Sequence, residues 1–168
     1  MILPGLAIGD RWWRVERDDP RARRVVDAEP PHYSRQTPGA AEFMSSGRTL
    51  VLLTDDERAV WGAIENLDPA GGLHWRVSLF RNLGSGLSSG LVREATCRTF
   101  AFWERHYGAR PPVPLRTEVN PARVRRKRDP GRCFLRAGWL RVGMSRGLVV
   151  LEAPGEGERI AGLAVGVG

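Results

Sequence analysis

The sequence predicts an α+β domain with some α/β character, in which helices flank one mixed, mostly antiparallel sheet of about six to seven strands. Two observations lead to this fold class. Short segments rich in β-branched and aromatic residues recur along the chain, and turn-forming residues separate them. Segments with apolar residues three and four positions apart lie between some of them. The resulting order is strand, helix, three strands, helix, strand, helix and two strands, which is typical of a sheet covered by helices.

Seven segments are expected to form the strands. The sequence TDDER, residues 54–58, lies between the second and third of them and predicts a hairpin turn. The expected strands are residues 11–16, 49–54, 59–65, 74–80, 115–119, 140–143 and 148–152.

Three segments are expected to be helical, namely residues 19–29, 87–107 and 130–138. Pro20 lies near the start of the first, where proline is tolerated because its missing N–H is not needed. Gly108 follows the long second helix as a stop signal. We expect residues 1–154 to form a single domain and the glycine-rich residues 155–168 to form a flexible tail.

The charge of the chain favours acidic partners. The 168 residues carry a formal net charge of +7, and all but one of the 26 basic residues are arginines. Nucleic acid, phosphate-bearing cofactors and tRNA are the partners that such a charge attracts. The densest basic run is residues 122–132, which is either a phosphate-gripping segment or a solvated loop. Its candidate nucleic-acid contacts are Arg123, Arg125, Arg126, Lys127 and Arg128.

Several classes of protein are disfavoured. The chain has no run of about 18 apolar residues, so we expect no membrane span. The first residues lack the basic start and long apolar stretch of a secretory signal. Cys97 and Cys133 suggest no disulfide framework, which fits the cytoplasm of a bacterium or of a phage-infected host cell. No Cys/His spacing indicates a metal site, although His32 and Tyr33 have side chains that can bind one.

The segment RNLGSG, residues 81–86, links an expected strand to the long expected helix. Such a loop presents free backbone N–H groups and the positive end of the helix dipole, which together form an anion site. Its spacing matches the acyl-coenzyme A signature [R/Q]-x-x-G-x-[G/A]. A chain of this composition contains about 0.7 such matches by chance, so the strand–loop–helix context carries the prediction. The candidate cofactor-binding residues are Arg81, Asn82, Gly84, Ser85, Gly86, Ser88 and Ser89.

The element order and this motif resemble the GNAT acyltransferase fold over roughly residues 11–154. RNLGSG lies where that fold has its pyrophosphate loop, residues 115–124 resemble its fifth strand, and residues 131–143 resemble its following helix and exit strand. Four segments further resemble a group of phage and bacterial proteins that includes the Mom-type DNA-modification proteins. They are HYSRQTPG (residues 32–39), LFRN (79–82), TEVNP (117–121) and KRDPGRCFLRAGW (127–139).

This resemblance implies a transferase that moves an acyl or acyl-like group to an amine. In the Mom-type case the amine is N6 of adenine in DNA. The alternative is an acyl-coenzyme A-dependent N-acetyltransferase that acts on a small-molecule or protein amine. A third reading is a binding module that has kept the fold and lost the chemistry. The donor is expected to be acetyl-coenzyme A or another acyl donor, including an aminoacyl-tRNA.

Glu118 is the expected base, because it lies in the fifth strand beside the strand that carries the motif. A surface glutamate paired with an arginine is the alternative. GNAT enzymes often place a tyrosine after this strand to protonate the departing thiolate, but the matching segment here has Cys133 and Phe134. If a tyrosine acts, it is Tyr33 or Tyr107. The resemblance implies that the proline-rich loop carrying Tyr33 covers the acceptor site, and a plain surface loop is the alternative. The catalytic candidates in this loop are His32, Tyr33 and Ser34, which together can donate, accept and stack on a base or another planar acceptor.

Two side-chain readings are left open. Arg81 is expected either to contact the cofactor phosphates or to cap its loop. Tyr107 and all six tryptophans are expected to be structural and to belong to the core, although Trp61 and Trp75 could instead stack on a base.

Overall fold

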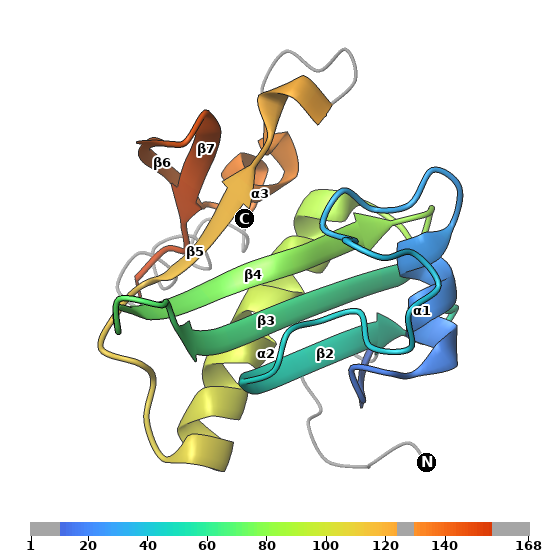
Figure 1. Ribbon diagram of the computed structural model, residues 1–168, viewed down its shortest axis with the longest axis horizontal. Helices are drawn as coiled ribbons and strands as arrows, with labels where there is room; N and C mark the ends of the chain where they lie inside the picture. The colour runs from blue at the N-terminus through green and yellow to red at the C-terminus, as the bar shows by residue number, and fades with distance from the viewer. Residues whose placement is uncertain (1–10, 124–129, 156–168) are drawn as a thin grey trace, which may run out of the picture.

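The computed structural model describes residues 11–123 and 130–155. Seven strands form one open sheet in the order β1-β2-β3-β4-β5-β7-β6, and Figure 1 shows α2 behind the sheet and α1 at its other side. Among the described strands, β4 and β5 pair in parallel and the other neighbouring pairs are antiparallel. The strands are β1 (Trp12–Val15), β2 (Arg48–Thr54), β3 (Ala59–Leu67), β4 (Leu73–Asn82), β5 (Leu115–Val119), β6 (Leu140–Ser145) and β7 (Leu148–Glu152). The helices are α1 (Pro20–Asp27), α2 (Ser88–Tyr107) and α3 (Arg132–Arg136), with a 3-10 turn at Pro121–Arg123.

The structure confirms the α+β class, the mostly antiparallel sheet and the predicted order of elements. The boundaries differ where the hydrogen-bonded ladder continues beyond the apolar pattern. β4 runs on through Asn82, because Arg81 and Asn82 still pair with Val60 and Ala59 of β3. These two residues are therefore strand residues, and the loop before α2 begins at Leu83. The first and third helices are shorter than predicted by a few residues at their ends.

The two faces of the sheet are covered by different helices. α2 and α3 pack on one face over a core that includes Trp61, Trp75 and Trp103. α1 packs on the other face, where Val25 and Val26 meet apolar residues of β2, β3 and β4. The predicted core role holds for five tryptophans, whereas Trp13 is half-buried. The buried five are Trp12, Trp61, Trp75, Trp103 and Trp139.

Local signals explain where the helices begin and end. The Asp19 carboxylate accepts hydrogen bonds from the N–H groups of Arg21 at 2.8 Å and Ala22 at 3.4 Å, so it caps the start of α1. Pro20 occupies the first helical turn, as the sequence predicted. α2 ends at Gly108, whose φ of 84° is the left-handed conformation that glycine adopts without strain.

Two buried hydrogen bonds tie the aromatic core to α2. The Trp61 indole N–H donates to Thr99 Oγ1 at 3.0 Å, and the Trp139 indole N–H donates to Thr96 Oγ1 at 3.1 Å. All four residues are buried, so these polar groups have no access to water. The threonine acceptors therefore fix how the indoles of β3 and of the residue before β6 sit on the helix.

Two irregularities in β4 shape the centre of the sheet. Gly62 pairs with Leu79 and Ala63 pairs with Val77, so Ser78 is an extra residue that forms a β-bulge. On its other side, β4 pairs with β5 only from Trp75 to Val77. Figure 1 shows β5 then turning away from β4, together with β6 and β7. The sheet is thus open on the β5 side of β4 where the bulge occurs.

Some sequence-based expectations concern residues that the structure does not describe. The N-terminal residues 1–10, basic residues 124–129 and tail residues 156–168 lie outside the described residues. Within the described ranges, no helix combines the length and the apolar character needed to cross a membrane.

Replacing Thr99 with valine should destabilise the fold, because it keeps the side-chain shape but leaves the buried Trp61 N–H without an acceptor. We expect a loss of about 1–3 kcal/mol in the free energy of unfolding, measured by urea denaturation. The control is Thr37→Val in an exposed turn, which should change stability by less than about 0.5 kcal/mol. Equal stability of the two variants would contradict a structural role for this hydrogen bond.

Candidate functional site

A cleft of about 280 Å³ opens where β4 and β5 separate. The last paired residues are Val77 and Thr117, and Thr117 Oγ1 donates to the Val77 carbonyl at 2.9 Å. Beyond this point no β5 residue pairs with β4, so that edge of β4 faces the cleft. The lining residues are Tyr33, Arg76, Val77, Ser78, Glu118, Asn120 and Leu148.

Glu118 and Tyr33 meet in this cleft from distant parts of the chain. Side chains along β5 alternate between buried and exposed, and Glu118 lies on the exposed face. The Tyr33 hydroxyl lies 3.4 Å from the Glu118 backbone carbonyl and can donate a hydrogen bond to it. Burial against the protein raises the pKa of Tyr33, and neighbouring Cys133 and Glu118 add to this effect. Tyr33 therefore keeps its proton at neutral pH while 44% of it remains accessible.

His32 supports Tyr33 and is itself kept neutral. The two rings stack with their centroids 4.3 Å apart and their planes 29° apart. Burial and the positive charge of Arg81 lower the pKa of His32 to about 4. Nδ1 accepts the Ser34 backbone N–H at 3.2 Å and lies 2.7 Å from Ser34 Oγ, so the neutral ring carries its proton on Nε2. His32 is thus a poor base at neutral pH, and its bonds hold the loop that carries Tyr33.

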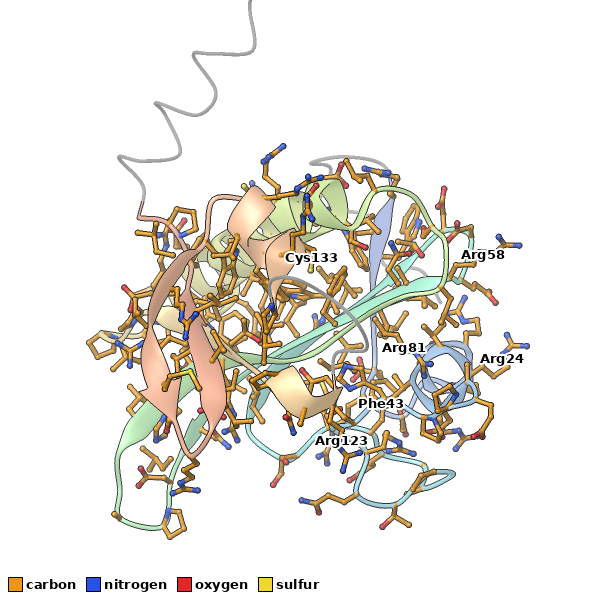
Figure 2. The ribbon with its side chains drawn as sticks, turned by 90° about the horizontal axis from the view of Figure 1, so that it is seen from above. Arg24, Phe43, Arg58, Arg81, Arg123 and Cys133 are labelled. Carbon is orange, nitrogen blue, oxygen red and sulfur yellow. The ribbon has the colours of Figure 1, made fainter. Side chains whose placement is uncertain are left out.

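Arg81 anchors this loop to the end of α1. Its Nη1 donates to the carbonyls of Val26 at 2.9 Å and Ala28 at 2.8 Å, and its Nη2 donates to the carbonyl of Pro30 at 2.7 Å. Figure 2 shows Arg81 beside α1, whereas Arg24 projects from the outer side of that helix. A cation at the C-terminal carbonyls of a helix is electrostatically favourable.

This geometry corrects the predicted role of Arg81. Its guanidinium donates to three carbonyls at the end of α1, on the side of the sheet away from the glycine loop. The side chain is therefore neither a cap of that loop nor directed at a phosphate bound there. Arg81 instead holds residues 28–34, and with them His32 and Tyr33, above the cleft.

A second arginine braces the same region. Arg35, whose side chain is 4% exposed, pairs with Asp27 through Nε at 2.6 Å and Nη2 at 3.1 Å. The same guanidinium donates to the carbonyls of Ala40 at 2.8 Å and Glu42 at 3.0 Å. The loop that carries Tyr33 is therefore held at one end by Arg81 and at the other by Arg35.

The glycine loop is organised by Asn82, which the sequence analysis placed among the cofactor-binding candidates. Its Oδ1 accepts the N–H groups of Gly84 at 3.0 Å and Ser85 at 2.8 Å, and its Nδ2 donates to the Gly86 carbonyl and to Ser88 Oγ. Gly84 and Gly86 have φ values of 102° and 125°, which other residues rarely adopt. Because Asn82 uses the amides of Gly84 and Ser85, those two N–H groups are not free for a phosphate.

The start of α2 is the part of this region that can receive an anion. Leu87 precedes the helix, and within the described residues no side chain caps it. A Cβ added to Gly86 would lie 3.2 Å from Arg11 Nη1, and one added to Gly90 would lie 4.0 Å from Arg11 Nη2, so this guanidinium lies against the first turn. Arg11 pairs with Glu94 at 2.5 Å, a bond that raises the Arg11 pKa. First-turn amides and Arg11 thus offer positive charge together.

The structure brings some predicted site residues together and separates others. Glu118 and Tyr33 line the cleft, His32 stacks on Tyr33, and Ser34 bonds to His32. The cofactor candidates from Asn82 to Ser89 lie in the loop and first turn of α2, at the end of β4, and Ser89 is buried. Arg123 lies in the exposed 3-10 turn after β5, and the remaining basic candidates, residues 125–128, lie outside the described residues.

Sequence reasoning missed four polar residues of the site. Arg76, Ser78 and Asn120 line the cleft, and Arg11 lies beside the start of α2. Arg76 could have been predicted as a site residue, because it lies in the strand that leads into the RNLGSG segment. No sequence signal marks the bulge at Ser78 or the approach of Arg11, because both depend on pairing between distant segments.

Comparison with protein-family models, curated proteins and solved structures found no match to this chain. Within residues 11–123 and 130–155, no group of three or more His, Cys, Asp or Glu side chains lies close enough to hold a metal ion. The function is therefore argued from the cleft itself.

Replacing Arg81 with methionine should release the loop above the cleft, because three charge-assisted hydrogen bonds are lost. We expect faster amide hydrogen exchange in residues 28–34 and a loss of about 3 kcal/mol in the free energy of unfolding. Arg24→Met, which removes an exposed ion pair with Glu57, is the matched control and should change little. Unchanged exchange in the Arg81 variant would contradict its anchoring role.

Acid should destabilise the protein through His32. Its pKa is about 4 in the folded protein and 6.5 in the unfolded chain, so the unfolded chain binds more protons between these values. Stability should therefore be fully present above pH 6.5 and fall by about 2–3 kcal/mol as the pH drops to 4. Urea denaturation across this range should show a smaller slope for His32→Gln. An identical slope in both proteins would exclude His32 as the titrating group.

Proposed function

We propose that this chain is a GNAT-like N-acyltransferase that modifies nucleic acid, with N6 of adenine in DNA as the acceptor amine. The observation that carries the proposal is the opening between the parallel strands β4 and β5, which places Glu118 and Tyr33 in one cleft. The remaining evidence concerns the donor, the proton transfers and the acceptor.

The topology agrees with the acyltransferase fold that the sequence resembles. A single parallel pair lies in an otherwise antiparallel sheet, and the bulge at Ser78 lies beside the opening. The unpaired edge of β4 provides backbone groups that are available to polarise a carbonyl, as an oxyanion-type site requires. A loop and the uncapped N-terminus of α2 follow directly after this strand.

The start of α2 suits the phosphate end of an acyl donor such as acetyl-coenzyme A. Its first-turn amides and the Arg11 guanidinium would hold the phosphates, and the left-handed Gly86 allows a close approach of the backbone. A bound donor would supply an activated carbonyl carbon. An aminoacyl-tRNA is an alternative donor, which the net charge of +7 also suits.

Two residues can handle the protons of such a transfer. Glu118 is exposed in the cleft and can accept the proton that the amine loses, directly or through a water. Tyr33 has a raised pKa and so retains a proton that it can give to the leaving group. His32 and Arg81 act on these steps by positioning Tyr33. The loop thus supplies the hydroxyl that residues 133 and 134 lack.

A nucleic-acid acceptor is supported by the rim of the cleft. The stacked rings of His32 and Tyr33 offer an aromatic surface on which a base can stack. An adenine in a duplex would have to be flipped out of the stack to reach Glu118, and the positive charge of the chain would hold the backbone.

A small-molecule or protein amine is the second candidate. The size of the cleft favours it, because about 280 Å³ is near the lower limit for ligand sites and fits a small acceptor without any flipping. DNA binding separates the two: a nucleic-acid enzyme should bind DNA with a strong salt dependence, whereas a small-amine enzyme should not.

The proposal predicts a heavier deoxyadenosine in DNA from cells that express the protein, detected by nucleoside mass spectrometry. Glu118→Gln and Tyr33→Phe should each lower the yield by about 100-fold or more, because each removes one proton-transfer group. Matched controls are Glu152→Gln, whose carboxylate pairs with Arg116, and Tyr107→Phe, whose ring at the end of α2 packs against Trp103.

Digested tRNA and total small amines from the same cells extend the measurement to the other acceptors. An acylated small amine with unmodified DNA would favour the second candidate. Wild-type yields in both Glu118→Gln and Tyr33→Phe would reject this cleft as the site of transfer.

A further inference from the structure

One charged side chain in the cleft has no role in the chemistry above. Arg76 lines the cleft from β4, and its Nε is buried without a hydrogen-bond partner. Within the described residues, no hydrogen bond or ion pair is formed by the Arg76 guanidinium. A buried unpaired donor is costly and uncommon in folded proteins, so this group needs an explanation.

Comparison with the neighbouring Arg116 shows that Arg76 does not take part in an ion pair with a described residue on this face of the sheet. Arg116 is its register partner on β5 and lies on the same face of the sheet. Arg116 is committed to Glu152, with N–O distances of 3.1 and 3.2 Å. Arg76 is less exposed than Arg116 and has no such carboxylate among the described residues.

The cleft also keeps Arg76 apart from Glu118. Adjacent strands lie about 4.8 Å apart and two residues span about 6.6 Å along a strand, so the two Cα atoms are roughly 8 Å apart. Among the described residues, no ion pair joins these two side chains, and Arg76 Nε has no hydrogen-bond partner. The polar Ser78 and Asn120 and the apolar Val77 and Leu148 also line the cleft.

We propose that Arg76 binds an anionic group on the acceptor, so that the acceptor is an amine that also carries a phosphate or a carboxylate. The amine would lie at Glu118 and the anion at Arg76, whose planar guanidinium matches both kinds of oxyanion. This inference rests on the proposed function, because it names the substrate class of the same cleft. A nucleotide supplies the phosphate, and an amino acid supplies the carboxylate.

The test is direct binding without any donor, measured by isothermal titration calorimetry on the full chain. Two pairs of probes each differ by the anionic group. One pair is 2′-deoxyadenosine 5′-monophosphate and 2′-deoxyadenosine, and the other is lysine and cadaverine. In the wild-type protein, the anionic member of at least one pair should bind about 10- to 100-fold more tightly than its neutral partner. The pair that shows the preference identifies phosphate or carboxylate as the group.

Variants assign the preference to Arg76. Arg76→Met keeps the apolar stem and should abolish it, and Arg76→Lys should retain part of it because the charge remains. Arg116→Met removes one positive charge from the same face and should leave the preference intact. If Arg116→Met lost the preference for the anionic probe as fully as Arg76→Met, the preference would come from the general positive charge of this face. That result would overturn the proposal.

Two other results would also overturn it. One is equal binding of the charged and neutral members of both pairs, or no binding of either anionic probe at millimolar concentrations. The other is an undiminished preference in Arg76→Met. Failure of the proposed function is distinguishable, because Glu118→Gln should remove transfer and leave the anion preference unchanged.

Discussion

The Arg81 guanidinium, bound to three carbonyls at the end of α1, is the contact on which the candidate site depends. It joins the last residues of β4 to residues 26–30, which lie more than fifty positions earlier in the chain. His32 follows this segment directly and donates its backbone N–H to the Val26 carbonyl at 2.9 Å. Arg35 holds the other end of the loop, and the Tyr33 hydroxyl itself makes only a 3.4 Å contact with the Glu118 carbonyl. The site is therefore preorganised by an interaction that lies outside the cleft.

The opening between β4 and β5 has a physical cause in the sheet itself. On the β3 side the ladder of β4 continues from Leu73 to Asn82, interrupted only by the bulge at Ser78. On the β5 side, three residue pairs with β4 are enough to keep β5 in the sheet. β5 is also held by its pairing with β7 and by the buried Leu115, Thr117 and Val119. β4 can thus be rigid along one edge and open along the other. Rigid walls around an open polar edge are what a site for positioned chemistry requires.

The sequence was sufficient to predict the helices and strands, but it was not sufficient to predict the contacts between distant side chains. Apolar periodicity located all seven strands and three helices, because a side chain's burial follows from the period of its element. The resemblance to the acyltransferase fold supplied Glu118 and Tyr33 as candidates, and it offered Arg81 either as a phosphate contact or as a cap of its loop. A motif position specifies the backbone, whereas the long arginine side chain can reach either face of the sheet. Arg76 and Arg11 were missed for the same reason. Whether an arginine side chain has a partner, and which one, depends on contacts between segments that are distant in the sequence.

The proposed role of Tyr33 as proton donor would explain how residues 133 and 134 can lack a tyrosine. Phe134 is buried against Trp61, Phe80 and Trp139, so a hydroxyl there would lie in the aromatic core. Tyr33 reaches the cleft from the opposite side, and its environment keeps it protonated while Glu118 remains open to solvent. In the proposed transfer, Tyr33 would act as the acid and Glu118 as the base. Arg76 would then be left for the proposed recognition of an anion, because neither proton transfer requires a guanidinium.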